Sequence, residues 1–324
     1  MPTKYVPYYA LGLCICTSIE SLVIKHVQSL YPTAPPSVVL VFLTELLKLC
    51  IFVPVSLLVH RYNKQHIQHD IEEEEPLLEQ PILVNEAVYH WTNRYKSVVY
   101  LIPAAIYALS NNLVYFALQH MSPALFTLLM GLKIPFTGVL AYLCLNKEMS
   151  REQWFSLFLI FVGTSIAMIQ PSSNGSIGYT ITGILAVLAY STCSASAAVF
   201  MEWMTQHVRK RECVFKQSAE FAFYSVLSNL IAIIISSSYD WSSLRWGHVA
   251  SMSSMFFNGL ATALVIKYGG SIPKVYSSSM ASILTAGLSY LVWHRVLHWN
   301  YWVGATLCIV AVDIYARNYR LFRT

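Results

Sequence analysis

Polar side chains that could bind an anion stand inside some of the most apolar stretches of this sequence. Asn111 and Asn112 lie near the middle of one stretch, and Lys133 lies near the middle of the next. A further lysine, Lys274, follows two glycines and a proline that interrupt two later stretches. A charge at membrane depth costs a few kcal/mol even on the mildest insertion scale. We therefore expect these groups either to be paired structurally or to bind a polar substrate, and two lysines suit a substrate with phosphate.

Hydroxyl side chains accompany the second lysine. Tyr276 and Ser278 follow Lys274 within about one helical turn and add hydrogen-bond donors. A lysine at a helix N-terminus is repelled by the positive end of the helix dipole. A substrate anion at that position would be attracted both by the lysine and by the dipole. The alternative interpretation of Lys274 is a lysine that extends to the membrane surface and obeys the charge rule for cytoplasmic loops.

Acidic residues in the apolar stretches are candidates for helix pairing or gating. Glu45 and Lys48 are three residues apart, so they share one helix face and can form an ion pair. That pair suits a structural role as well as it suits transport. Glu202 and Glu220 lie near the end of one stretch and the start of the next, without a local partner.

The sequence contains no pattern typical of an enzyme or of a metal protein. It lacks a P-loop, an H-E-x-x-H motif and any recognisable Ser/His/Asp arrangement. The seven cysteines form no C-x-x-C pair. We therefore expect no catalytic residues, no metal and no cofactor.

Composition indicates a multi-spanning membrane protein. Of 324 residues, 56% are hydrophobic and only 11% are charged, less than half the share in an average soluble domain. Apolar segments of about 20 residues, long enough to cross a bilayer, recur along the chain. We predict an all-α integral membrane protein of ten transmembrane helices, at about 6–28, 36–60, 97–119, 123–145, 154–170, 179–204, 214–237, 249–267, 275–293 and 301–316.

Positive charges predict the orientation of these helices. With a cytoplasmic N-terminus, sixteen of the 21 lysines and arginines fall at the cytoplasmic side. Only Lys25, Arg245 and Arg295 fall on the opposite side, and Lys48 and Lys133 lie within the membrane. This bias predicts that both termini are cytoplasmic, and it accounts for the basic runs without nucleic-acid binding.

An internal repeat divides the chain. The segment 137–154 matches the segment 285–302 without a gap at an offset of 148 residues, for example Tyr142 with Tyr290 and Trp154 with Trp302. The predicted loops of the two copies lie on opposite faces of the membrane. Two five-helix halves of opposite topology, 1–170 and 171–324, are typical of a secondary transporter that binds substrate between them.

Two loop motifs could modify trafficking. Residues 61–96 form the long hydrophilic connection, predicted to be cytoplasmic, and Glu73 with Leu77 and Leu78 matches an acidic dileucine sorting signal. The alternative is a plain solvated loop. Asn174 begins an Asn-Gly-Ser sequon on the non-cytoplasmic face, close enough to the bilayer that glycosylation and its absence are equally expected.

Several motifs together resemble a known family. YALSNN, TELLKL, the Lys133 segment, the V-F-M-E at 199–202 and GLATALVIKYGGSIPK are similar to the nucleotide-sugar transporters of the CMP-sialic acid, UDP-galactose and UDP-N-acetylglucosamine group, within the drug/metabolite transporter superfamily. KYGGSIPK and LTELLKL most resemble its less characterised UDP-sugar branch. The resemblance implies ten helices and exchange of a cytosolic nucleotide sugar for luminal nucleoside monophosphate. It also places the substrate site at Asn111, Asn112, Lys133 and Lys274.

The sequence departs from the family pattern around the base and ribose. Ser110 replaces the glutamine of the YALQNN motif, whose first residue, Tyr107, we include in the predicted site. Phe126 and Met130 replace two tyrosines, and Ser218 replaces an asparagine. These changes keep the predicted phosphate contacts and remove hydrogen bonds to the nucleoside.

We therefore expect a nucleotide-sugar antiporter of the Golgi membrane, with a UDP-sugar as the first candidate substrate and a CMP or CDP conjugate as the alternative. The endoplasmic reticulum and endosomes or lysosomes remain alternative locations. A transport-inactive scaffold for glycosylation enzymes and an exporter of another metabolite are further alternatives. Expected partners are the nucleotide sugar, the nucleoside monophosphate and membrane lipid, with a homodimer or a glycosyltransferase complex as options.

Overall fold

The computed structural model describes residues 5–31, 37–67, 97–120, 129–168, 181–210, 212–236, 244–293 and 298–321, and these residues are almost entirely helical. The described residues contain ten α-helices, a 3₁₀ turn η2 (Val98–Tyr100) and a π-helical turn η3 (Met204–Val208). The α-helices are α1 (Val6–Leu30), α2 (Ser37–Ile67), α4 (Leu101–His120), α6 (Lys133–Leu145), α7 (Arg151–Met168), α8 (Ile181–Trp203), α9 (Val214–Ser236), α10 (Trp246–Tyr268), α11 (Ser271–Trp293) and α12 (Trp299–Leu321).

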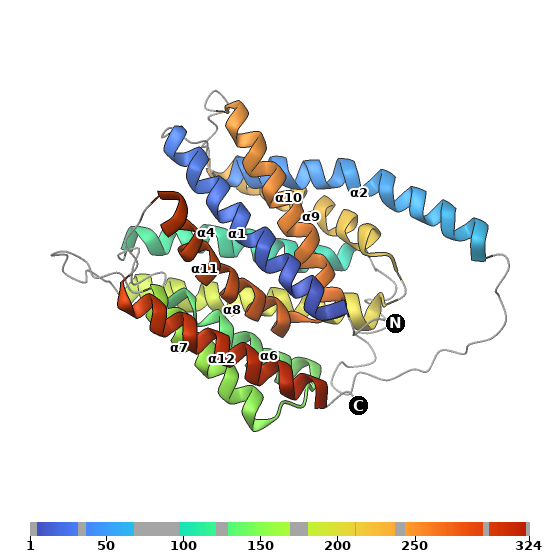
Figure 1. The fold of residues 1–324 in the computed structure, drawn as a ribbon. Coiled ribbons are helices and arrows are strands. Elements are labelled where there is room, and N and C mark those ends of the chain that lie inside the picture. Colours follow the sequence, from blue (N-terminus) through green and yellow to red (C-terminus); the bar gives the residue numbers. More distant parts are fainter. Residues whose placement is uncertain are drawn as a thin grey trace.

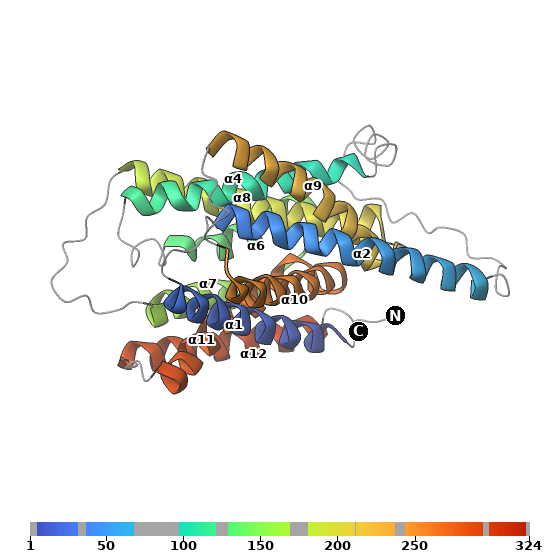
Figure 2. The ribbon, with the colours of Figure 1, turned by 90° about the horizontal axis from the view of Figure 1, so that it is seen from above.

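The helices form one bundle, in which α4 packs between α8 and α9, and α1 packs between α10 and α11 (Figure 1). Helix α2 lies along α9, and α7 lies along α12. In both views α1 begins and α12 ends at the same end of the bundle, which agrees with the prediction that both termini share one side (Figure 2). Which side of a membrane that end faces stays a prediction.

Packing partners are exchanged between the two predicted halves. Helix α1, the first of its half, contacts α10 and α11, the third and fourth of the other half. Correspondingly, α8, the first of the second half, contacts α4 and α6, the third and fourth of the first. The second helices, α2 and α9, contact each other, and so do the fifth helices, α7 and α12. This is the pattern that two halves related by a two-fold axis would have, although their inverted topology stays a prediction.

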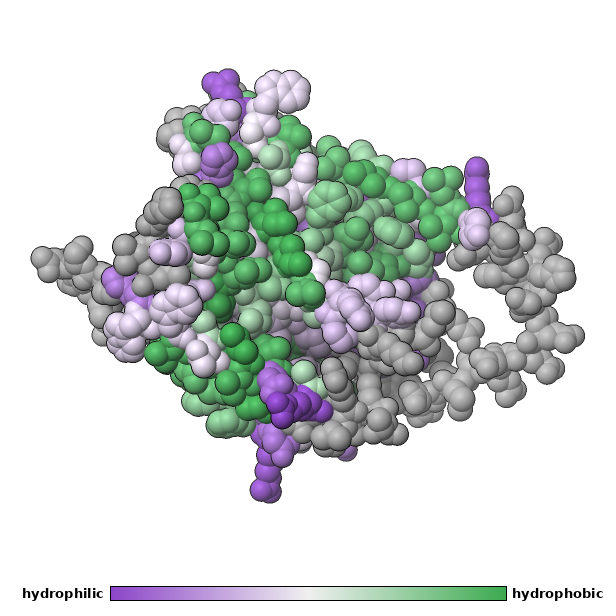
Figure 3. All heavy atoms as spheres, in the orientation of Figure 1, coloured by the Kyte–Doolittle hydropathy of each residue, from purple (hydrophilic) through white to green (hydrophobic). Residues whose placement is uncertain are grey.

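Six of the helical stretches are long and apolar enough to cross a membrane: Val6–Val27, Val39–Val59, Ile181–Val208, Val214–Ile234, Trp246–Tyr268 and Ser271–Val292. Their outward faces carry large apolar side chains, as the surface in Figure 3 shows. On α1 the exposed residues Leu11, Ile15 and Ile19 recur every four positions and form one stripe. A continuous apolar exterior on a polytopic helical chain fits contact with lipid rather than with water.

Several helix ends differ from the sequence prediction. Helix α2 continues to Ile67, seven residues into the segment predicted as loop, and its last turns project beyond the other helices (Figure 1). Helix α11 begins at Ser271 rather than at 275, because Pro273 is tolerated within a first helical turn. The predicted break before it is confirmed: α10 ends at Tyr268, and Gly270 adopts φ +96°. The π-helical turn η3 at the end of α8 was not predicted.

Helices α7 and α12 approach each other closely through glycine. A Cβ atom added to Gly304 would lie 2.4 Å from the carbonyl oxygen of Gly163 and 2.5 Å from the backbone nitrogen of Ala167. Both of these are backbone atoms, so no side chain can turn aside to make room. The glycines therefore set the spacing of the fifth helices of the two halves.

We predict that Gly304→Ala destabilises the protein by about 1–3 kcal/mol, because the added methyl group must push α7 and α12 apart. The measurement is thermal unfolding of the purified protein in detergent. Gly12→Ala in α1 is the matched control, since nothing lies within 4 Å of a Cβ at that position. Equal transition temperatures for the two variants would contradict the close packing of α7 on α12.

Candidate functional site

A cavity of about 380 Å³ lies between helices of both predicted halves. Its walls come from α2 and α4 on one side and from α8, η3, α9, α10 and α11 on the other. This volume is in the range of sites for small organic ligands. Five of the residues predicted for the site or its gating line it: Glu45, Lys48, Tyr107, Ser218 and Lys274.

Lys274 reaches the cavity beside an aromatic ring. Its Nζ donates a hydrogen bond to the hydroxyl of Tyr107 at 3.4 Å and lies 5.7 Å from the centre of that ring. Phe221 of α9 meets the same ring edge-on, with centroids 6.1 Å apart. Lys274 forms no ion pair with any carboxylate of the described residues. A lysine held by a phenol can exchange that weak contact for a stronger one with an anion.

The N-terminus of α11, one turn before Lys274, already holds a carboxylate. Oε2 of Glu202 accepts hydrogen bonds from the backbone N–H of Ser271 at 2.8 Å and from its hydroxyl at 2.6 Å, while Oε1 pairs with Lys147. Glu202 is fully buried. Gly270 leaves the space that this carboxylate needs, because a Cβ there would lie 2.3 Å from Oε1. The helix terminus is therefore capped by the protein itself.

A second group of polar residues lies between α1, α2 and α10, and Glu45, Lys48 and Asn258 of this group line the cavity. Glu45 and Lys48 form the predicted ion pair, with Oε1 and Nζ 2.7 Å apart. Asn258 donates through Nδ2 to Oε2 of Glu20, and its Oδ1 accepts a hydrogen bond from Thr17 at 2.8 Å. Glu20 thus finds its partner on a helix that lies far away in the sequence.

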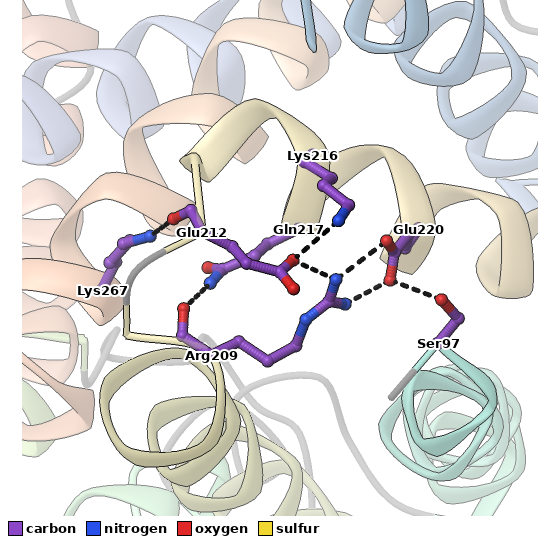
Figure 4. Close-up of polar contacts among 7 residues, drawn as sticks. All are labelled: Ser97, Arg209, Glu212, Lys216, Gln217, Glu220 and Lys267. Carbon is purple, nitrogen blue, oxygen red and sulfur yellow. Dashed lines mark hydrogen bonds and ion pairs between the residues drawn. The ribbon is translucent and has the colours of Figure 1, made fainter. Parts of the chain in front are cut away.

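A buried arginine joins helix ends near the cavity. Arg209, which is 3% exposed, donates to both oxygens of Glu220 on α9 and to Glu212 (Figure 4). Its carbonyl oxygen accepts from Gln217, a cavity residue, at 2.5 Å, and Ser97 donates to Glu220 at 2.9 Å. Burial alone would lower the pKa of Arg209, but hydrogen bonds and charge from Glu220 raise it above its ordinary value. The guanidinium therefore stays charged and holds η3, α9 and the start of α4 together.

Four predicted substrate residues lie outside the cavity walls. Lys133 is half-buried at the start of α6, and Met130 packs beside Ala117, Ala186 and Val187. The hydroxyl of Tyr276 hydrogen-bonds to Ser156 at 2.7 Å, and its ring stacks on Tyr315 at 4.5 Å. Ser278 donates to the carbonyl oxygen of Val275. Their proposed roles in substrate binding stay predictions.

Other predicted residues lie outside the described part of the chain. These are Phe126, Glu73, Leu77, Leu78 and Asn174, together with the side chains of Asn111 and Asn112, whose backbone belongs to α4. Ser110, which precedes that pair, is buried and hydrogen-bonds to the carbonyl oxygen of Ile106. Among the described residues, no group of three or more His, Cys, Asp or Glu side chains could hold a metal ion.

Sequence reasoning missed several cavity residues. Asn229 and Asn258 are amides in the middle of apolar helices, and that placement alone marks a residue as a functional candidate. Arg209 belongs with Lys210 and Arg211 to a basic run at the end of a predicted span, a pattern that indicates a cytoplasmic helix end. Only the fold shows that Arg209 is buried.

Comparison with known proteins agrees with this arrangement. A family model described as nucleotide-sugar transporter matches residues 3–316, almost the whole chain. The chain belongs to the nucleotide-sugar transporter family. This family member is 26% identical to the Caenorhabditis elegans UDP-galactose/UDP-N-acetylglucosamine transporter srf-3 over 95% of its own length and 81% of that protein.

The family member is similar to plant proteins as well. It is 25% identical to CMP-sialic acid transporter 1 of Oryza sativa subsp. japonica, over 69% of this chain and 74% of the relative. A solved crystal structure matches it with a TM-score of 0.71 over 99% of both chains at 12% identity, which supports the fold alone. The named relatives are transporters, in agreement with the expectation that this family member is not an enzyme.

We predict that Glu202→Ala destabilises this nucleotide-sugar transporter family member by about 1–3 kcal/mol. The substitution leaves the buried N–H of Ser271 without an acceptor and removes the partner of Lys147. Asp313→Ala is the control, because Asp313 pairs with Arg317 at 2.8 Å on an exposed helix face. Unfolding in detergent measures both variants, and an equal loss of stability would argue against a capping role for Glu202.

Proposed function

We propose that this protein exchanges a cytosolic nucleotide sugar for a luminal nucleoside monophosphate across the Golgi membrane, and that the cavity is its substrate site. One observation carries the proposal: Lys274 lines the cavity beside Tyr107 without a carboxylate partner among the described residues. A phosphate group would replace this phenol contact with a charge-assisted hydrogen bond. Lys48, the other lysine of the cavity walls, is already neutralised by Glu45.

The phosphate contact would be shared between the two halves. Lys133 opens α6 and Lys274 lies in the first turn of α11, and these equivalent helices pack against each other. The end of α6 lies beside the start of α11, since Lys147 follows α6 and pairs with the residue that caps α11. Helix α6 is about 20 Å long, so the lysines stand at different depths. We propose that Lys274 holds phosphate in the conformation described here, and that Lys133 contacts it as the halves move.

Alternating access would then be a rocking motion of the two halves. The exchange of packing partners between the halves supports this proposal. Equivalent helices make equivalent contacts, so contacts that open on one side of the bundle can form between the equivalent helices on the other side. Glu202 and Glu220 are the gating candidates, since each holds a helix end near the cavity. Asn111, Asn112, Phe126, Met130 and Ser218 remain the proposed contacts to the nucleoside.

The names of the relatives favour a nucleotide conjugate of uridine or cytidine. Relatives carry UDP-galactose, UDP-N-acetylglucosamine or CMP-sialic acid in their names. We propose a UDP-sugar as the first candidate and a CMP conjugate as the alternative. We propose the Golgi because it is the typical location of the family. The endoplasmic reticulum and endosomes are the other compartments to test.

We predict that Lys274→Ala and Lys133→Ala each reduce nucleotide-sugar exchange in proteoliposomes to background, because each removes a phosphate contact. Lys216→Ala is the control, since its side chain is 54% exposed and pairs with Glu212 at 3.5 Å. All three variants should elute as folded protein from size-exclusion chromatography. Normal uptake by Lys274→Ala would overturn the assignment of the cavity as the substrate site.

We further expect a single nucleoside monophosphate to raise the melting temperature of the purified protein. A panel of UMP, CMP and GMP identifies the base, and ligand binding to the native state stabilises it in proportion to ligand saturation. Stabilisation by UMP would support the UDP-sugar proposal. Stabilisation by no nucleotide would favour the transport-inactive scaffold, and stabilisation by a non-nucleotide anion would favour another metabolite.

A further inference from the structure

One end of the cavity carries more acid than base. We call it the acid-rich end, and it consists of Glu20, Glu45, Lys48 and Asn258. Glu45, Lys48 and Asn258 line the cavity directly, and Glu20 is bonded to Asn258 from behind. Two carboxylates share one ammonium, because Lys48 pairs with Glu45 and also lies within electrostatic range of Glu20. The end therefore has an excess of one negative charge when both acids are ionised.

Lys48 is already engaged by a carboxylate, because its Nζ lies 2.7 Å from Oε1 of Glu45. Its side chain lies against α10 at Gly259, where an added Cβ would be 2.6 Å from Nζ. An anionic group arriving at this end would compete with both carboxylates for the same lysine.

The acid-rich end also contains hydrogen-bonding capacity that is not used. Oε2 of Glu45 is buried and has no hydrogen-bond partner among the described residues, although the other oxygen is paired. An unsatisfied buried oxygen favours a ligand that donates a hydrogen bond. Asn258 donates one N–H to Glu20 and accepts one hydrogen bond from Thr17. Its amide therefore has a second N–H to donate and a second lone pair to accept with. Sugar hydroxyls both donate and accept, so they match this set.

The spacing from Lys274 suits a ligand with separate phosphate and sugar parts. Lys274 and Lys48 line the same cavity from different helices. Gly259, against which Lys48 lies, precedes the end of α10 at Tyr268 by nine residues, or about 14 Å of helix axis, and Lys274 stands in the first turn of α11, after the turn at Gly269 and Gly270. A phosphate on Lys274 therefore leaves the rest of the molecule free to reach the acid-rich end.

We propose that the acid-rich end is a sugar subsite that accepts an uncharged, hydroxyl-bearing sugar and rejects one that carries a carboxylate. Hydroxyl groups of the sugar bind Oε2 of Glu45 and the free positions of Asn258. A sugar carboxylate meets the excess negative charge at short range in a poorly solvated site, where like charges repel strongly. This inference rests on the proposed transport of a nucleotide sugar and names its substrate class.

The test uses conjugates that differ only in one carboxylate. Where UMP binds, UDP-glucose is compared with UDP-glucuronate. Where CMP binds, the methyl ester of CMP-sialic acid is compared with CMP-sialic acid itself. Calorimetry on the detergent-solubilised protein should show the uncharged member binding at least tenfold more tightly. Equal or tighter binding of the acidic member overturns the sugar subsite and leaves the transport proposal standing, whereas binding of neither monophosphate overturns both.

Two variants separate charge from shape. Glu45→Gln and Glu20→Gln each remove one negative charge, so each should shrink the preference for the uncharged sugar about tenfold. Glu152→Gln, at the exposed start of α7, is the matched control and should leave the preference unchanged. A preference that survives in both variants would show that shape rather than charge selects the sugar, and would overturn the proposal.

Discussion

A charge inside hydrocarbon must find its counter-charge within the protein, because lipid supplies none. The described helices follow this rule at three of their carboxylates, whereas Glu20 is bonded to the amide of Asn258. Glu45 has Lys48, Glu202 has Lys147 with the N-terminus of α11, and Glu220 has Arg209. These pairs also tie particular helices together: Glu202 connects α8 to α11, and Arg209 connects the end of α8 to α9. The pairing of the charges therefore depends on the arrangement of the helices. A bundle with a misplaced helix would leave a buried carboxylate without a partner.

How far the sequence predicts this structure depends on the distance between interacting residues. The helices were predictable because each is a long apolar run, and Glu45–Lys48 was predictable because its residues are three apart on one face. The contact between Glu20 and Asn258 spans 238 residues, and that between Glu202 and Ser271 spans 69. No local pattern links such residues, and they meet only because α1 packs on α10 and α8 lies beside α11. Arg209 shows a second limit, because a basic run indicates a surface on average and says nothing of the one member that turns inward.

The two lysines predicted to bind phosphate, Lys133 and Lys274, differ in their relation to the cavity. Both stand in first turns of equivalent helices, yet Lys274 lines the cavity and Lys133 does not. Their positions within the helices also differ, because Lys133 is the first residue of α6 and Lys274 the fourth of α11. Since Pro273 fits the first turn, α11 starts at Ser271, four residues before the predicted start. Glu202 then occupies the helix terminus, where the sequence had suggested a substrate anion. The proposed contact with an anion therefore rests on the side chain of Lys274, which is hydrogen-bonded to Tyr107, rather than on the helix dipole.

Under the proposed function, Lys274 would also give a physical reason for exchange rather than one-way transport. Closing the cavity around an empty site would leave this ammonium desolvated with only a phenol as partner, a cost of several kcal/mol for an unpaired ion. A bound phosphate removes that cost, whether it belongs to a nucleotide sugar or to a nucleoside monophosphate. The loaded carrier could then pass through its closed state in either direction, while the empty carrier would be held back. On the proposed function, the coupling of the two fluxes would follow from one lysine that lacks a carboxylate partner among the described residues.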